Sequence, residues 1–192
     1  HRIEHCTLVN PGLLDRMHAL KCIANPFCTY VYYHGEKMKF FGEERLEWMF
    51  PQRSFIDYDI ISTGATDYPP GPFEPLLGIQ SCVTRIDSSG NIWGPNQKIS
   101  VEEAIKIYTL NGAYASFEEN LKGSITPGKL ADYVGLAEDL TAIDPLTIKD
   151  VDVLSHLLSY ITMMLMVMVS ALMRKNVLLI QISRMRVSVA AA

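Results

Sequence analysis

The first quarter of the chain alternates between two hydrophobic periods. Residues 2–8 and 22–26 are short apolar runs, the second ended by Pro26, and each predicts a buried strand. Residues 10–21 follow a helical period instead, with Pro11 in the first turn and four apolar side chains on one face, namely Leu13, Leu14, Met17 and Leu20. A strand followed by a helix is half of a parallel repeat.

The alternation continues as far as residue 85. Residues 30–42 predict an aromatic loop, and residues 43–50 predict a helix that ends before Pro51. Residues 58–67 predict a third strand, with a sharp backbone turn at Gly64, and residues 73–85 predict another helix. Three strand–helix alternations favour an α/β architecture with parallel strands.

The second half of the chain changes character. Residues 87–98 are rich in Gly, Asn, Ser and Pro and predict an exposed loop. A capping box of Ser100 and Glu103 opens a predicted helix over 101–116. Residues 131–138 then alternate like a strand in a sheet, so the pattern passes from α/β to β.

The sharpest change in composition follows Asp152. All 21 acidic residues lie at or before this position, whereas Arg174, Lys175, Arg184 and Arg186 are the only charged residues after it. Residues 153–173 form a segment without formal charge, and this segment is long enough for a transmembrane helix. Residues 153–192 are therefore set apart as an atypical tail with two open interpretations: a membrane anchor, or a slipped reading frame, in which methionine codons conceal a run of acidic and glycine residues.

Composition narrows the class of protein. A chain of 192 residues with 48% hydrophobic and 20% charged residues is ordinary for a globular domain. The net charge of −4 and the lack of a basic stripe exclude nucleic acid as a partner and leave small ligands open. Four cysteines without a CxxC pair predict buried free thiols. The first residues show no secretory pattern; localisation is left open, with the cytoplasm favoured, and oligomeric state is also left open.

The order of motifs resembles a known family. The strand with "RIEH", the segment "TGATDYPPGPFEPLLGIQSCVTR", the helix with "SVEEAIKIYTLNGAYA" and the closing "KGSITPGKLADYV" together resemble the C-terminal part of the amidohydrolase superfamily. The resemblance covers about residues 1–154 and is greatest to amidohydrolase family three, in the branch of exoenzyme-like and N-acyl or formamide hydrolases. "KGSITPGKLADYV" is its most specific part.

The resemblance implies a fold and a domain division. In that family a distorted (β/α)8 barrel binds divalent metal at the C-terminal ends of its strands, beside a small β-sandwich. It implies that residues 1–118 are a partial barrel, about strands six to eight, that residues 119–152 belong to the sandwich, and that the tail follows from residue 153.

The resemblance also implies a site. His5 matches the histidine that closes the sixth strand, a metal ligand or substrate-orienting group, and Asp67 matches the aspartate that closes the eighth, which contacts metal and moves a proton. Hydrolysis of a small-molecule amide at neutral pH needs an activated water, for which a divalent metal, zinc by preference, and an adjacent carboxylate are suited. Non-peptide carbon–nitrogen bonds are the expected target.

Structural roles compete with these assignments. His5 could be a core histidine and Asp67 a turn or helix-cap residue. His18 and His34 are expected at the surface, and Arg85 is expected to brace a loop rather than to bind a substrate carboxylate. Tyr30 and the other aromatic residues of 30–42 could line an acyl pocket or pack in the core.

Two departures limit the resemblance. Residues 1–192 offer two ligands where catalytic zinc sites usually take about three protein ligands, and Thr66 replaces the serine common before Asp67. We therefore expect a fragment that is inactive by itself. Two rival hypotheses are a non-catalytic module completed by a partner chain and a membrane-anchored vestigial protein.

Overall fold

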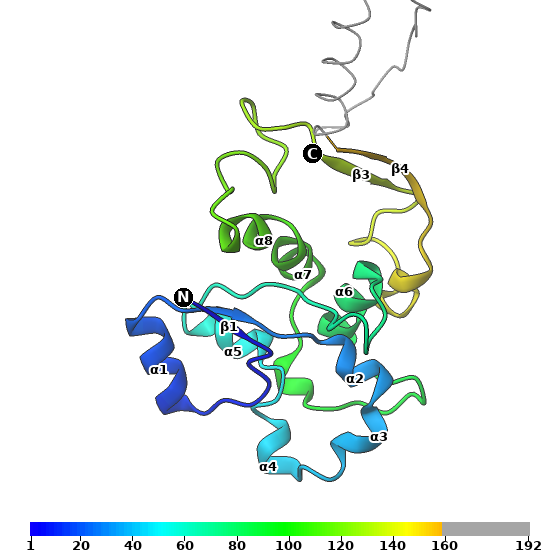
Figure 1. The fold of residues 1–192 in the computed structure, drawn as a ribbon. Helices are drawn as coiled ribbons and strands as arrows, with labels where there is room; N and C mark the ends of the chain where they lie inside the picture. The colour runs from blue at the N-terminus through cyan, green and yellow to red at the C-terminus, as the bar shows by residue number, and fades with distance from the viewer. Residues whose placement is uncertain (159–192) are drawn as a thin grey trace, which may run out of the picture.

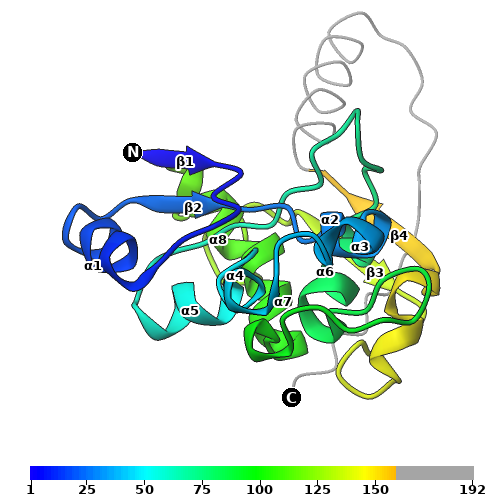
Figure 2. The ribbon, with the colours of Figure 1, turned by 90° about the horizontal axis from the view of Figure 1, so that it is seen from below.

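The structure is a computed structural model, and it describes residues 1–158. β1 (Arg2–Glu4) pairs in parallel with β2 (Ile23–Asn25), and Figure 2 shows the two strands side by side. Ala24 of β2 also forms a parallel bridge with Ser62. The predicted parallel arrangement is present, although the third strand is reduced to this bridge.

β1 is exposed, so the prediction of a buried strand is wrong here. All three of its residues are exposed, and Ile3 retains 38% of its surface. Among the described residues β1 pairs only with β2. An edge strand with one neighbour buries less of its surface than a central strand does.

The first predicted helix is confirmed as α1 (Pro11–Ala19). Asn10 caps it, because its side chain accepts a hydrogen bond from the Leu13 backbone N–H at 2.9 Å. Leu14 and Met17 are buried with Ala24 in a small apolar cluster, whereas Leu13 and Leu20, which we had placed on the same face, are exposed. The buried stripe is therefore narrower than predicted.

The segment after β2 folds differently from the prediction. The predicted loop over 30–42 is largely helical, with α2 (Thr29–Tyr33) and α3 (Gly35–Met38). Of the helix predicted over 43–50, the first turn is present as α4 (Glu43–Leu46), and α5 (Gln52–Asp57) follows it. Val31, Met38 and Leu46 each place an apolar side chain in the core. Burial at isolated positions holds these helices, and such burial leaves no helical period in the sequence.

The later helices follow the prediction more closely. α6 (Pro75–Thr84) and α7 (Val101–Tyr108) lie where expected, and α7 has the predicted capping box. The Ser100 hydroxyl accepts a hydrogen bond from the Glu103 N–H at 3.2 Å, and the Glu103 carboxylate accepts one from the Ser100 N–H at 2.8 Å. The helix predicted to continue to Ser116 breaks at Thr109, and α8 (Leu110–Ala115) follows.

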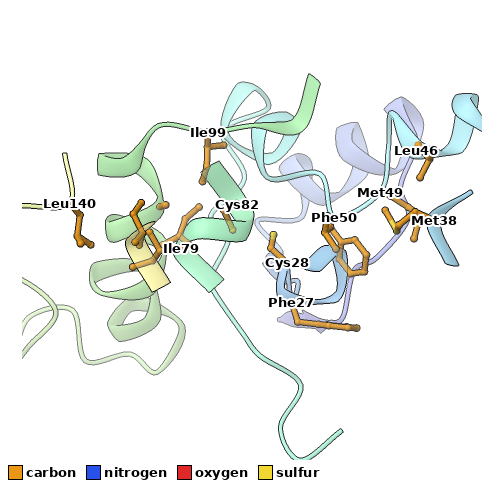
Figure 3. Packing of buried hydrophobic residues seen from close by; sticks show 14 residues of the cluster. Phe27, Cys28, Met38, Leu46, Met49, Phe50, Ile79, Cys82, Ile99 and Leu140 are labelled. Atoms are coloured by element: carbon orange, nitrogen blue, oxygen red, sulfur yellow. The ribbon is translucent and has the colours of Figure 1, made fainter. Parts of the chain in front are cut away.

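The main core lies between the short helices and α6. Its members include Phe27, Phe50 and Ile79 (Figure 3). Cys28 and Cys82 are both buried in this core (Figure 3), while Cys6 and Cys22 are only partly buried. All four cysteines are free thiols, as predicted, although only two of them are fully buried.

The predicted exposed loop over 87–98 is partly buried, contrary to expectation. Asp87 is 5% exposed and Gln97, in the 3-10 helix η1 (Pro95–Gln97), is 2% exposed. The Gln97 amide donates to the Glu47 carbonyl and the Ser54 hydroxyl, both at 2.7 Å. Polar residues typical of loops are here used to satisfy buried backbone groups.

An antiparallel pair completes the described chain. β3 (Tyr133–Leu136), which was predicted, pairs with β4 (Val153–Leu157), and the 3-10 helix η2 (Pro145–Asp150) packs on α6. Figure 1 shows this pair at the opposite end of the molecule from α1. Residues 153–157, which we assigned to the tail, thus form a strand of this sheet.

The rest of the tail, residues 159–192, lies outside the described residues, so the membrane-anchor and slipped-frame hypotheses stay untested there. Within residues 1–158, no helix has both the length and the hydropathy of a membrane span.

Candidate metal and catalytic site

The structure brings His5 and Asp67 together. His5 directly follows β1, and Asp67 lies five residues beyond the bridge at Ser62, so both sit past the carboxyl ends of parallel strands. His5 Nε2 lies 3.3 Å from Asp67 Oδ1. Their side chains are 63% and 35% exposed, respectively, which leaves both open to a ligand. Both residues have positive φ, 64° and 59°, so the backbone turns sharply at each of them.

An aromatic side chain positions the imidazole. The Phe27 ring stands edge-on to His5, with centroids 4.9 Å apart and an interplanar angle of 74°. Phe27 is itself packed against Phe50 at 5.3 Å and Tyr30 at 5.9 Å. Sequence reasoning missed Phe27, although its place just after β2 was a usable signal, because parallel strands end at a shared edge.

The segment before Asp67 is fixed by its neighbours. The Ala65 N–H donates to the Pro26 carbonyl at 3.2 Å, and the Tyr108 hydroxyl donates to the Ala65 carbonyl at 3.3 Å. The Thr29 hydroxyl donates to the Thr66 carbonyl at 3.3 Å. These bonds reach the segment from Pro26 in the β2–α2 connection, from α2 and from α7, and they limit the positions that Asp67 can adopt.

Gly64 was predicted to allow a sharp turn, but the structure shows that it makes room for the Tyr108 ring. A Cβ atom at this position would overlap the Tyr108 ring, and a Cβ at Gly78 of α6 would overlap the Tyr108 hydroxyl. The phenol therefore fits between two glycines. Its burial raises the pKa of Tyr108 well above the ordinary value, so the hydroxyl remains a hydrogen-bond donor.

A line of polar side chains joins the three strand ends. The Asn25 amide donates to the Glu4 carboxylate, and the Thr63 hydroxyl donates to the Asn25 side-chain oxygen. Arg2 also pairs with Glu4. The hydrogen bond from Asn25 is the main cause that lowers the pKa of Glu4, with smaller contributions from Arg2 and His5. Because Glu4 and Thr63 stand near His5 and Asp67 in the chain, this line helps to fix the spacing of the two strands that carry them.

The other residues singled out from the sequence lie elsewhere. His18 is exposed on α1, as expected. His34 is half-buried and packs against Tyr30, with ring centroids 4.9 Å apart and the ring planes inclined by 58°. Tyr30 packs against the core, while Phe40 of the same aromatic run is exposed.

Arg85 has the bracing role that we favoured. It is fully buried, and its guanidinium donates to the main-chain carbonyls of Trp93, Phe50 and Met49 at 2.8, 3.2 and 3.0 Å. Burial is the main cause that lowers its pKa. With its donors turned to the backbone, Arg85 is not placed to bind a substrate carboxylate.

The donor atoms suit a divalent metal, but they do not complete a site. An imidazole nitrogen and a carboxylate oxygen are ligands that zinc and similar ions accept. Within residues 1–158 no cluster of three or more His, Cys, Asp or Glu side chains is arranged to hold a metal. His5 and Asp67 are thus two ligands of a set that would need at least one more.

Curated proteins are similar to this chain in sequence. The chain is 37% identical over 107 residues to putative amidohydrolase YtcJ of Bacillus subtilis (strain 168), which covers 54% of the chain and 20% of that protein. It is 31% identical over 142 residues to the N-substituted formamide deformylase of Arthrobacter pascens, covering 72% and 26%. The chain therefore spans about a fifth to a quarter of the length of these curated relatives.

Solved structures agree with the fold. An uncharacterised metal-dependent hydrolase from Pyrococcus furiosus superposes with a TM-score of 0.57 at 26% identity, over 68% of this chain and 26% of that one. A second, from Pyrococcus horikoshii OT3, gives a TM-score of 0.65 at 24% identity, over 75% and 30%. The fold is that of the barrel-type metal-dependent hydrolases. The model of the amidohydrolase family matches residues 1–169, and the chain belongs to that family.

Proposed function

We propose that this chain is part of a metal-dependent hydrolase that cleaves a non-peptide carbon–nitrogen bond in a small-molecule amide. The observation that carries the proposal is the 3.3 Å approach of His5 Nε2 to Asp67 Oδ1 beyond the ends of parallel strands. Active sites of barrel enzymes lie at this end of the strands. The family, and a relative named for deformylation of N-substituted formamides, support the reaction class.

In this proposal His5 and Asp67 hold a divalent metal, with zinc the preferred ion for their nitrogen and oxygen donors. A bound metal supplies Lewis-acid polarisation and lowers the pKa of water. Phe27 holds the His5 ring in place, and the bonds to Ala65 and Thr66 hold Asp67. Asp67 accepts a proton from the attacking water and returns it to the departing nitrogen.

We further propose that residues 1–118 supply about strands six to eight of a barrel, and that the chain alone is inactive. Two ligands are fewer than the three that a catalytic zinc site usually takes, and the chain spans only 20–26% of its curated relatives. The complete enzyme is then this chain joined to the remaining strands, in one polypeptide or with a partner chain. Gel filtration separates the two, because an obligate partner gives a stable complex.

Substitution of Asp67 tests the catalytic assignment. In the complete enzyme, Asp67→Asn should lower kcat for amide hydrolysis by at least about a hundredfold, since proton transfer contributes this much. Asparagine tolerates the positive φ of this position, so the circular dichroism spectrum and Tm should stay close to those of the wild type.

The matched control is Asp15→Asn, an exposed residue on α1, which should leave kcat unchanged. Metal content is measured alongside activity, and His5→Ala should reduce it. Wild-type turnover by Asp67→Asn with full metal content would exclude the assigned role.

A further inference from the structure

Three consecutive residues between β2 and α2 reach both members of the candidate site. The Phe27 ring lies edge-on to the His5 imidazole, and the Thr29 hydroxyl donates to the carbonyl of the residue before Asp67. Only one residue, Cys28, separates Phe27 from Thr29 in the chain. A shift of this short segment, residues 27–29, would therefore move the support of His5 and the support of Asp67 together.

Segment 27–29 is anchored by the described chain itself. Phe27, Cys28 and Thr29 are 8%, 1% and 2% exposed, respectively. Cys28 lies in the main core with Cys82 of α6 (Figure 3). Because neighbours within residues 1–158 already bury these side chains, the placement of the segment does not depend on the remaining strands of the barrel.

The contacts around Phe27 lead back to His5. The Phe27 ring packs against Phe50, and the Phe50 N–H donates to the carbonyl of Thr7, two residues after His5, at 2.7 Å. Arg85 donates to the Phe50 carbonyl at 3.2 Å. The same buried group of residues thus supports both the imidazole ring and the backbone that follows it.

Thr29 acts on the backbone of Asp67. The Thr66 carbonyl and the Asp67 N–H belong to one planar peptide unit, so a donor that fixes the carbonyl also fixes the plane from which Asp67 begins. Asp67 has a φ of 59°, which costs free energy for a residue other than glycine and is kept where neighbouring contacts impose it. The Gly71 N–H holds the far end of the residue, because it donates to the Asp67 carbonyl at 3.1 Å. Thr29 therefore helps to set the direction in which the carboxylate leaves the backbone.

We propose that Thr29 is a positioning residue that directs the Asp67 carboxylate towards His5, and that segment 27–29 sets the separation of the two as one unit. The inference rests on the proposed function, which makes His5 and Asp67 a working pair. It adds that the pair depends on a buried hydroxyl whose acceptor is a main-chain carbonyl rather than either side chain.

The first test is Thr29→Val in the complete enzyme, which replaces the hydroxyl by a methyl group of similar size. It should lower kcat by about tenfold and change KM by less than about twofold, because a misdirected base costs rate and not binding. Thr29→Ser keeps a hydroxyl and should restore most of kcat. The matched control is Thr84→Val, which removes a buried hydroxyl that donates to the Gln80 carbonyl of α6 and should leave kcat unchanged.

Double-mutant cycles show whether the effect passes through the pair. In an Asp67→Asn background, Thr29→Val should lower kcat by less than about twofold, because the carboxylate that it directs is gone. Phe27→Leu should also lower kcat, and the loss in Phe27→Leu/Thr29→Val should be smaller than the product of the two separate losses. An equal effect of Thr29→Val with and without the carboxylate would overturn the role of Thr29, and losses that multiply would overturn the single unit.

Hydrogen exchange of the metal-free complete enzyme separates this inference from the proposed function. The Gly71 N–H should exchange about tenfold faster in Thr29→Val than in the wild type, since one anchor of the Asp67 backbone is lost. An unchanged rate at Gly71 would overturn the inference, whatever the activity. Absence of amide turnover by the wild type, together with the faster exchange in the variant, would overturn the proposed function alone.

Discussion

Arg85 and Asp87 organise the connection between α6 and α7 through one shared neighbour. Arg85 donates to the Trp93 carbonyl, and the Trp93 indole N–H donates to the Asp87 carboxylate at 2.8 Å. Asp87 also accepts from the backbone N–H groups of Ser89 and Asn91, each at 2.9 Å. A cation and an anion thus hold this segment without touching each other, because each is satisfied mainly by neutral donors or acceptors.

Asp87 should make stability depend on acidity. Its burial raises the pKa, but the bonds from Trp93 and Asn91 outweigh this and leave the pKa below the ordinary value. A carboxyl whose folded pKa is lowered contributes stability above its unfolded value, about 3.9, and loses the contribution as the pH falls through the folded value. The excess stability of wild type over Asp87→Asn should therefore be constant from pH 7 to about pH 5 and shrink below about pH 4.

Urea denaturation across this pH range measures the difference in the free energy of unfolding. Asp15→Asn, on the exposed face of α1, should show no such trend. An excess that persists unchanged at the lowest pH would show that the carboxylate charge at Asp87 has no role.

At the scale of elements, one residue, Glu103, links the N-terminal cap of α7 to the neighbouring helix α5. Glu103 closes the capping box with Ser100 and also accepts a two-pronged contact from Arg53 of α5, at 2.9 and 3.0 Å. One carboxylate therefore both starts α7 and joins it to α5.

Ser100→Ala should remove the hydroxyl half of the capping box and leave the contact between Glu103 and Arg53. The Glu103 N–H loses its acceptor, and the free energy of unfolding should fall by about 1 kcal/mol, the usual cost of losing such a cap. Chemical denaturation is the measurement. Ser88→Ala, at an exposed serine outside the helices, is the control and should change the value by less than about 0.5 kcal/mol; equal losses in both variants would contradict the role of the cap.

The elements also show what the sequence could and could not predict. α1, α6 and α7 were found because their buried faces repeat at helical spacing or begin with a cap. The start of α4 was also predicted, within the helix over 43–50, whereas α2, α3 and α5 were not, since their few buried positions do not repeat over a helical period. His5 and Asp67 came from a family resemblance, whereas Asn25, Thr63 and Phe27 act through neighbours far along the chain, which no local pattern records.

For the molecule as a whole, the question is how the β3–β4 pair is attached to the helical part. η2 provides the contact: Ile148 is fully buried in the main core, and the Lys149 N–H donates to the Gln80 side chain of α6 at 3.0 Å. The main core thus includes side chains from Phe27 to Ile148 and is common to the helical part and η2.

Ile148→Ala should weaken this attachment. Removing a fully buried isoleucine side chain costs about 2–5 kcal/mol, and limited proteolysis should begin between residues 137 and 152. Ile125→Ala removes the same atoms at a site that is 88% exposed and should have little effect. If both variants resist protease equally, the contact through η2 does not hold the two parts together.

The seat of Tyr108 between Gly64 and Gly78 also constrains how this protein can evolve. A methyl group gained at either glycine collides with the phenol, and a smaller residue in place of the phenol leaves a void beneath the strand end that leads to Asp67. Substitutions at these three positions are therefore expected to be correlated in evolution. Alanine at position 64 or 78 should be found first in homologues that lack the tyrosine at position 108.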